Sequence, residues 1–172
     1  MPRSGPVHPF QEPAMAQPVP PRLEPLDAIS RLTTDHEAVK ELFARYMGAT
    51  SLPQKKELID RLCTDLVVHM ALEEEIFYPA AEAVLDGSSL ILEAMAEHAA
   101  IKALITKIQE ADAAQQQIDD RIRLLAELVS SHVDEEQRRL FPKVRAKNLD
   151  LSALGDRLAQ RQEELLSVGS PG

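Results

Sequence analysis

Apolar residues recur at steps of three and four along most of the chain, which is the spacing of one face of an α-helix. Short polar stretches that contain Gly, Ser or Asp separate these periodic segments, so consecutive helices are expected to pack antiparallel. The predicted helices span about 27–47, 52–85, 89–111 and 117–146, followed by a short fifth helix within 149–168. The pattern therefore predicts an all-α fold, an up-down-up-down four-helix bundle over residues 26–148 with the C-terminal helix packed on the bundle.

The first 25 residues lack this periodicity and contain most of the twelve prolines of the chain. Such a segment buries too little apolar surface to offset the entropy of ordering, so residues 1–25 are predicted to form a disordered Pro-rich tail. The tail has no continuous apolar stretch of the kind found in signal peptides. No later segment approaches the roughly 18 apolar residues of a membrane span. A cytoplasmic protein is therefore predicted.

Composition and charge narrow the range of partners. Hydrophobic residues make up 44% of the chain but aromatic residues only 3%, which is typical of packed helices. The net charge of −9 disfavours nucleic acid and anionic membrane surfaces as partners, because both attract clustered Lys and Arg. The single cysteine, Cys63, has no partner for a disulfide within the chain and is expected to be a small buried residue.

Six polar residues lie on the apolar stripes of the predicted helices, where polar groups are costly unless they are satisfied. They are His36, His69, Glu73, His98, His132 and Glu136. In antiparallel helices, two residues lie at one level when their sequence midpoint falls in the turn between them. This condition holds for the two histidines of each hairpin, and also for Glu73 and His98 across the middle turn. The six side chains are therefore expected to converge on one band of the bundle interior.

The same residues also reveal a repeat between the two halves of the chain. The first half has His36 and, 33 residues later, His69, whereas the second has His98 and, 34 residues later, His132. In both halves the second histidine is followed by glutamate after four residues and by proline after ten. Repetition at this period indicates a duplicated helical hairpin.

Histidine and glutamate four residues apart place two potential metal ligands on one helix face. Four imidazoles and two carboxylates are too many for one tetrahedral zinc ion, but they suit two ions bridged by Glu73 and Glu136. Mixed nitrogen and oxygen ligation favours iron, with manganese or zinc as alternatives. The neighbouring Glu74, Glu75 and Glu135 are expected to be exposed to solvent.

Three other interpretations compete with a pair of bridged metals. A metal-free set of His–Glu ion pairs would bury charge for little net stabilisation. The ferritin-like diiron pattern is excluded, because it places Glu before His at three residues and has lone glutamates on the other helices. A plain helical interaction module is the third class, and it would require a metal-free bundle of undiminished stability.

The chain resembles the hemerythrin-like, HHE cation-binding family over roughly residues 28–146. The strings that carry the resemblance are Asp35-His36-Glu37, His69 to Pro79, Glu97-His98 and His132 to Pro142. The resemblance implies a four-helix bundle that holds a non-haem diiron centre, bridged by carboxylates and by an oxo or hydroxo group. It also implies, position by position, that the six residues named above are the metal ligands.

Two positions depart from the oxygen-carrying members of that family. Lys102 and Gln137 stand where those proteins have a further histidine and an aspartate ligand. Simple reversible oxygen carriage is therefore less favoured than binding or sensing of O2, peroxide or nitric oxide, or iron buffering. The alternative is an enzyme that consumes peroxide at the same centre. The expected partner is in either case a small diatomic molecule or peroxide, and no separate catalytic residues are predicted.

Overall fold

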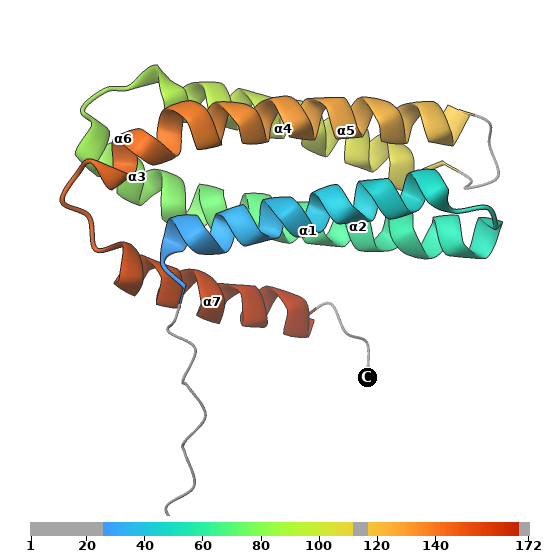
Figure 1. Cartoon of the computed structure of the whole chain (residues 1–172), viewed down its shortest axis with the longest axis horizontal. Coiled ribbons are helices and arrows are strands. Elements are labelled where there is room, and N and C mark those ends of the chain that lie inside the picture. The colour runs from blue at the N-terminus through green and yellow to red at the C-terminus, as the bar shows by residue number, and fades with distance from the viewer. Residues whose placement is uncertain (1–25, 112–116, 169–172) are drawn as a thin grey trace, which may run out of the picture.

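The computed structural model describes residues 26–111 and 117–168, and every element in them is helical (Figure 1). The elements are α1 (Ala28–Gly48), α2 (Leu52–Leu72), η1 (Glu73–Phe77), α3 (Tyr78–Leu85), α4 (Ser89–Gln109), α5 (Gln117–Glu135), η2 (Glu136–Leu140), α6 (Phe141–Arg145) and α7 (Leu151–Val168). The predicted disordered tail, residues 1–25, lies outside the described residues. None of the described helices is both long and apolar enough to cross a membrane.

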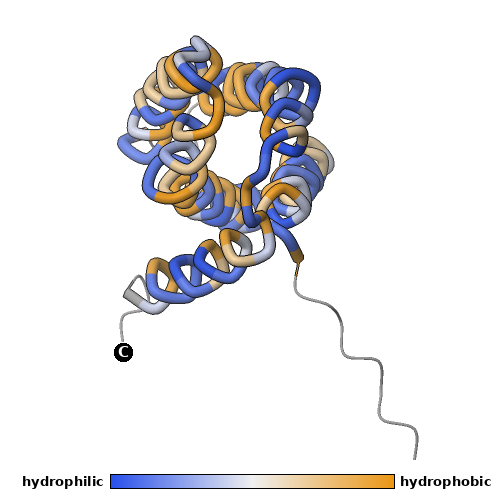
Figure 2. Tube along the Cα trace, turned by 90° about the vertical axis from the view of Figure 1, so that its left-hand side faces the viewer, coloured by the Kyte–Doolittle hydropathy of each residue, from blue (hydrophilic) through white to orange (hydrophobic). Residues whose placement is uncertain are grey.

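The bundle has four long helices, because α2, η1 and α3 run on without a break, as do α5, η2 and α6. Together with α1 and α4 they form the predicted up-down-up-down bundle. Seen along the bundle, the four helices form a ring and α7 lies outside it (Figure 2). The fifth helix packs on α1 and α2. The predicted fold class is therefore confirmed.

Local sequence signals explain where the helices begin and turn. Side-chain oxygens of Asp27, Ser51 and Ser88 each accept a backbone N–H from the first turn of α1, α2 and α4. The connection from α3 to α4 passes through Asp86 and Gly87, which have φ angles of 44° and 74°. Glycine adopts this left-handed backbone without steric cost. These caps and turns set the hairpins that align the helices.

Two π-helical turns interrupt the second and fourth long helices at matched places, where the periodicity predicted regular helix. Each turn begins at the glutamate that follows histidine by four residues, Glu73 in η1 and Glu136 in η2. Pro79 has no N–H to donate to the carbonyl four residues earlier, and the bonding changes so that Tyr78 N–H donates to Glu73 O. Pro142 has the equivalent effect in the other half. The prolines thus account for the position of both turns.

The apolar core consists of two clusters on either side of the polar band. One fills the end of the bundle nearer the α1–α2 turn and includes Tyr46, Leu62, Ile105 and Ile122. The other fills the opposite end, beneath α7, and includes Leu32, Phe77, Leu140 and Leu158. Cys63 is buried as expected, and burial together with the nearby Asp60 raises the pKa of its thiol to about 11.

Gly155 allows α7 to approach the start of α1 closely. A Cβ atom at this position would lie 2.3 Å from the carbonyl oxygen of Leu26. We therefore expect Gly155→Ala to push α7 away and to lower the free energy of unfolding by about 1–3 kcal/mol, as overpacking does. Gly48→Ala is the matched control, because a Cβ there would meet nothing within 4 Å. Chemical denaturation measures the stability of both variants, and equal stability of the two would contradict this packing.

Candidate metal centre

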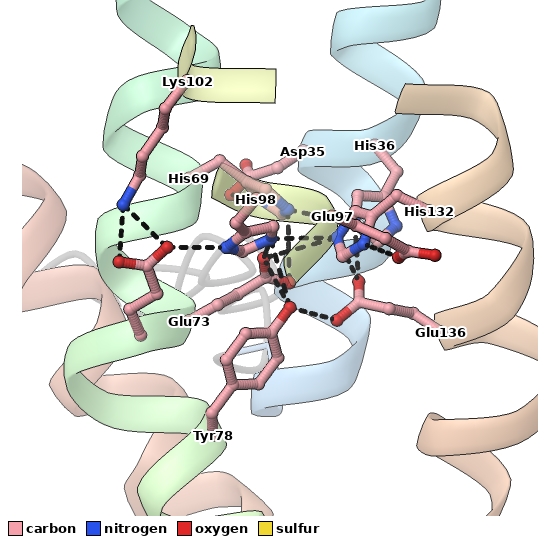
Figure 3. Close-up of polar contacts among 11 residues, drawn as sticks. Asp35, His36, His69, Glu73, Tyr78, Glu97, His98, Lys102, His132 and Glu136 are labelled. Carbon is pink, nitrogen blue, oxygen red and sulfur yellow. Dashed lines mark hydrogen bonds and ion pairs between the residues drawn. The ribbon is translucent and has the colours of Figure 1, made fainter. Parts of the chain in front are cut away.

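All six residues predicted as ligands meet in the interior between the two apolar clusters (Figure 3). The residues come from all four long helices: His36 from α1, His69 from α2, Glu73 from η1, His98 from α4, His132 from α5 and Glu136 from η2. Each has at most 5% of its surface exposed. In the structure the six side chains therefore converge on one band of the bundle interior, as expected.

The four histidines form two pairs that face the middle of this band. The Nε2 atoms of His36 and His69 are 3.0 Å apart, and those of His98 and His132 are also 3.0 Å apart. The Nδ1 atoms of all four rings contact other side chains instead. Each pair thus presents two inward nitrogen atoms on one side of the centre.

The two glutamates lie between the histidine pairs. Glu73 Oε1 is 3.3 Å from the Nε2 atom of His69, and its Oε2 is 3.2 Å from that of His98. Glu136 approaches the other histidine of each pair with one oxygen, Oε2, at 3.4 Å from His36 Nε2 and 3.5 Å from His132 Nε2. A carboxylate that contacts one histidine from each pair is placed to bridge two ions.

The donor set fits two metal ions. Two groups of donor atoms lie within 4.8 Å of one another: His36, His69, Glu73 and Glu136, and then Glu73, His98 and His132. Glu73 Oε1 and Glu136 Oε2 are buried and accept no hydrogen bond from the described part of the chain. An unsatisfied buried carboxylate oxygen is costly, and a bound cation would compensate it.

Without metal, the same groups perturb one another's ionisation. Burial lowers the pKa of His69, but the carboxylates of Glu73, Asp35 and Glu136 outweigh it and raise this pKa to about 10. Burial likewise opposes protonation of His132, yet Glu73 and Glu136 raise its pKa to about 9. Burial raises the pKa of Glu73, whereas the neighbouring histidines lower it well below its usual value. The metal-free centre therefore favours imidazolium–carboxylate pairs.

Two acidic residues lie beside the second histidine of each half, outside the centre. Glu97 Oε2 lies 2.8 Å from His132 Nδ1, and Asp35 Oδ2 lies 3.5 Å from His69 Nδ1. The hydrogen bond with Glu97 fixes the His132 ring and leaves its Nε2 free for a metal, whereas Asp35 lies beside His69 without a hydrogen bond. Neither acid is among the residues predicted from the sequence. The signal was present, because an acid directly precedes the first histidine in both halves.

Glu74 was expected to be exposed, and that prediction is wrong. Its side chain is only 20% exposed, and it lies 2.8 Å from His98 Nδ1. Lys102 Nζ donates to both Glu74 oxygens, at 2.7 and 2.6 Å. Partial burial raises the pKa of Glu74, but the contacts with Lys102 and His98 outweigh it and lower this pKa. Glu75 and Glu135 are exposed, as predicted.

Tyr78 is a further residue of the centre that sequence analysis did not assign. Its hydroxyl donates to Glu136 Oε1 at 2.8 Å and lies 3.2 Å from His98 Nε2. Tyr78 follows Glu73 by five residues, and the i→i+5 bonding of η1 brings the two onto the same face. Burial, and then Glu73 and Glu136, raise the pKa of the phenol, so Tyr78 stays protonated.

Two cavities border the centre. A small space of about 10 Å³ is lined by His36, His69 and His132 and by apolar side chains that include Val39 and Ile101. A space of this size holds about one water molecule. On another side, a surface groove of about 380 Å³ between α4 and η2 is lined by residues that include Glu97 and Glu136. The centre thus has a small apolar chamber on one side and an acidic groove on another.

The comparisons with known proteins agree with this site. The model of the hemerythrin HHE cation-binding domain family matches residues 27–144, so the chain belongs to this family. A solved structure of a hemerythrin HHE cation-binding domain-containing protein from Mycobacterium kansasii has a TM-score of 0.72 and is 25% identical. The likeness covers 83% of this chain and 89% of that one.

Two further proteins are similar to this chain. An uncharacterised protein of Mycobacterium tuberculosis is 24% identical over 151 residues, covering 85% of this chain and 90% of its own length. A DNA nickase of Nostoc sp. is 29% identical over 111 residues, covering 64% of this chain. This chain spans only 31% of the nickase. The shared segment is therefore a minor part of that protein.

Proposed function

We propose that the protein is a non-haem diiron protein that binds or senses O2, peroxide or nitric oxide, or that buffers iron. The six ligands would be His36, His69, Glu73, His98, His132 and Glu136. One observation carries the proposal: six buried donors meet at one level, and two of their carboxylate oxygens have no hydrogen-bond donor among the described residues. Nitrogen and oxygen donors in this number favour iron, with manganese or zinc as alternatives.

The small apolar chamber supports a small ligand. Its volume of about 10 Å³, enough for about one water molecule, excludes an organic substrate from this side of the centre. Three of the proposed ligand histidines line it, so a molecule held there would lie beside their rings. The apolar remainder of the lining, which includes Leu66, Met70 and Val129, excludes bulk water from that side of the centre.

Tyr78 favours the second candidate, an enzyme that consumes peroxide. Iron would supply the redox chemistry of such a reaction. The Tyr78 hydroxyl donates to Glu136 and lies 3.2 Å from His98 Nε2, so it could orient a peroxide bound beside His98 through a hydrogen bond. Burial and the two glutamates raise the pKa of the phenol, so it would serve as a neutral hydrogen-bond donor in such a reaction.

Iron loading followed by a peroxide assay tests both candidates. We expect the purified full-length protein to bind about two iron ions per chain when Fe²⁺ is added without oxygen. A protein that holds only traces of iron after growth in iron-rich medium, and binds none anaerobically, would overturn the proposal. Decomposition of many equivalents of hydrogen peroxide per centre would support the enzyme. Oxidation that stops after one equivalent would support the binding or sensing function.

The activity named for the Nostoc relative is not proposed for this chain. The match covers 31% of that nickase, and a net charge of −9 opposes contact with a phosphate backbone.

A further inference from the structure

The outer contacts of the centre occupy matching positions in the two halves of the repeat, but they differ in length and in chemistry. In each half, the acid before the first histidine lies beside the second histidine. Glu97 is hydrogen-bonded to His132 at 2.8 Å, whereas Asp35 is 3.5 Å from His69 and forms no hydrogen bond with it. In each half, the residue after the ligand glutamate contacts the first histidine of the other half. That residue is Glu74 in the first half and Gln137 in the second. The repeat therefore places a carboxylate behind one histidine and an amide behind its counterpart.

The two contacts differ in geometry as well as in charge. Glu74 Oε1 lies 2.8 Å from His98 Nδ1, and a carboxylate there accepts the ring N–H. Gln137 Nε2 lies 3.3 Å from His36 Nδ1. A donor facing Nδ1 holds the ring proton on Nε2, the atom that would have to bind a metal. Even with its carbonyl oxygen turned toward the ring, Gln137 is a neutral acceptor and polarises the imidazole less than a carboxylate does.

The lysine that follows the first histidine by four residues shows the same break. Lys102 is anchored to both oxygens of Glu74. Lys40 holds the equivalent place after His36, but its side chain is 78% exposed and its ion pair, at 3.8 Å, is with Glu37. Residue 137 offers no carboxylate to Lys40, and the Lys40 side chain lies at the surface. His98 therefore has both a carboxylate and an anchored lysine behind it, whereas His36 has neither.

We infer that the two metal positions are inequivalent, that the one held by His98 and His132 binds its ion more tightly, and that Glu74 and Gln137 set the difference. The inference rests on the proposed metal-binding function. The inner donors do not account for it. Glu136 belongs to the donor group of His36 and His69 but not to that of His98 and His132, so the inner donors alone would favour the other position. The outer contacts outweigh this difference in the proposed centre. Both histidines at the tighter position have a carboxylate at 2.8 Å behind them.

Titration of the metal-free, full-length protein with Co²⁺ tests this inference, because Co²⁺ reports binding through its visible absorption without redox change. We expect two binding steps whose dissociation constants differ by about tenfold. Glu74→Gln should weaken the tighter step by about 10- to 100-fold, the usual effect of losing an outer partner, and leave the other step within twofold. Gln137→Glu should restore the repeat and tighten the weaker step by about tenfold.

Two exposed positions give matched controls for the two changes of charge. Glu75→Gln removes a carboxylate next to Glu74, and Gln54→Glu adds one at the start of α2; neither residue contacts the centre. Both should leave both steps within twofold. Circular dichroism would show that each variant is folded, and Gln137→Glu tests the inference through a gain of affinity that misfolding does not produce.

The possible failures are distinguishable. Two ions bound with one affinity in the wild type, a shift of both steps together in Glu74→Gln, or an unchanged weaker step in Gln137→Glu would overturn the inference and leave the proposed function standing. A wild-type protein that binds no Co²⁺ and no iron would overturn the proposed function itself. The counterpart of Tyr78 in the second half is Phe141, and both residues are unchanged in every variant.

Discussion

Replacing Glu73 by Ala is expected to reduce metal binding from two ions to one or none. The carboxylate lies between the two histidine pairs, 3.3 Å from one ring nitrogen and 3.2 Å from another, so its loss affects both metal positions. The metal-free variant should also lose about 3–5 kcal/mol of unfolding free energy, because His69 and its neighbours would retain buried positive charge without their partner. Metal analysis after reconstitution and urea denaturation of the metal-free protein measure the two effects.

Glu75→Ala is the control for this change. Glu75 lies in the same π turn but is exposed and pairs with Arg161 of α7 at 2.7 Å. Exposed pairs of this kind contribute little to stability, so the variant should bind two ions and unfold close to the wild type. Normal metal binding by the Glu73 variant, with loss of metal from the Glu75 variant, would mean that the ligand assignment on this helix is wrong.

The stability of the metal-free protein is expected to fall as the pH rises from about 6.5 to 10. His69 and His132 have pKa values of about 10 and 9 in the folded protein, above the 6.5 of a free histidine. Their ion pairs therefore stabilise the fold fully below about pH 6.5, and this contribution is lost as the pH passes through 9 and 10. The pKa of Glu73 is lowered, so its contribution is present above pH 4.5 and is lost in acid. The total change is on the order of several kcal/mol.

Metal binding should show the opposite dependence on pH. The histidines must lose their protons to bind an ion, so affinity rises with pH and binding releases protons. The gap between the melting temperatures of metal-loaded and metal-free protein should therefore widen between pH 6 and 9. Melting curves across this range measure both trends. A metal-free protein whose melting temperature stays constant or rises from pH 6.5 to 9 would contradict the ionisation described for the centre.

The sequence was sufficient to predict the bundle and the convergence of six polar residues, because both depend on periodicity. Apolar steps of three and four define each helix, and the placement of turns halfway between His36 and His69 fixes their level. Buried histidines at repeated positions are a strong signal, since an unsatisfied polar group in a bundle core is costly. Neither the helical periodicity nor the common level of the polar residues depends on how closely two helices approach each other.

The outer contacts could not be predicted, because they depend on distances between helices. Glu74 is one position round the helix from Glu73. If this helix is considered alone, that position lies on an exposed flank. The packing of α4 against that flank places His98 and Lys102 within 3 Å of it. Tyr78 was missed for a different reason: in a regular helix a residue five positions after Glu73 faces away, and only the π turn brings it back. Pro79 was the sequence signal for that turn.

The absorption spectrum of the oxidised, iron-loaded protein tests most directly whether the six residues bind two ions as one centre. With about two irons per chain, we expect the charge-transfer bands of an oxo- or hydroxo-bridged ferric pair, and we expect them to disappear in Glu73→Ala. A spectrum of isolated ferric ions, or bands that persist in that variant, would contradict a carboxylate-bridged diiron centre.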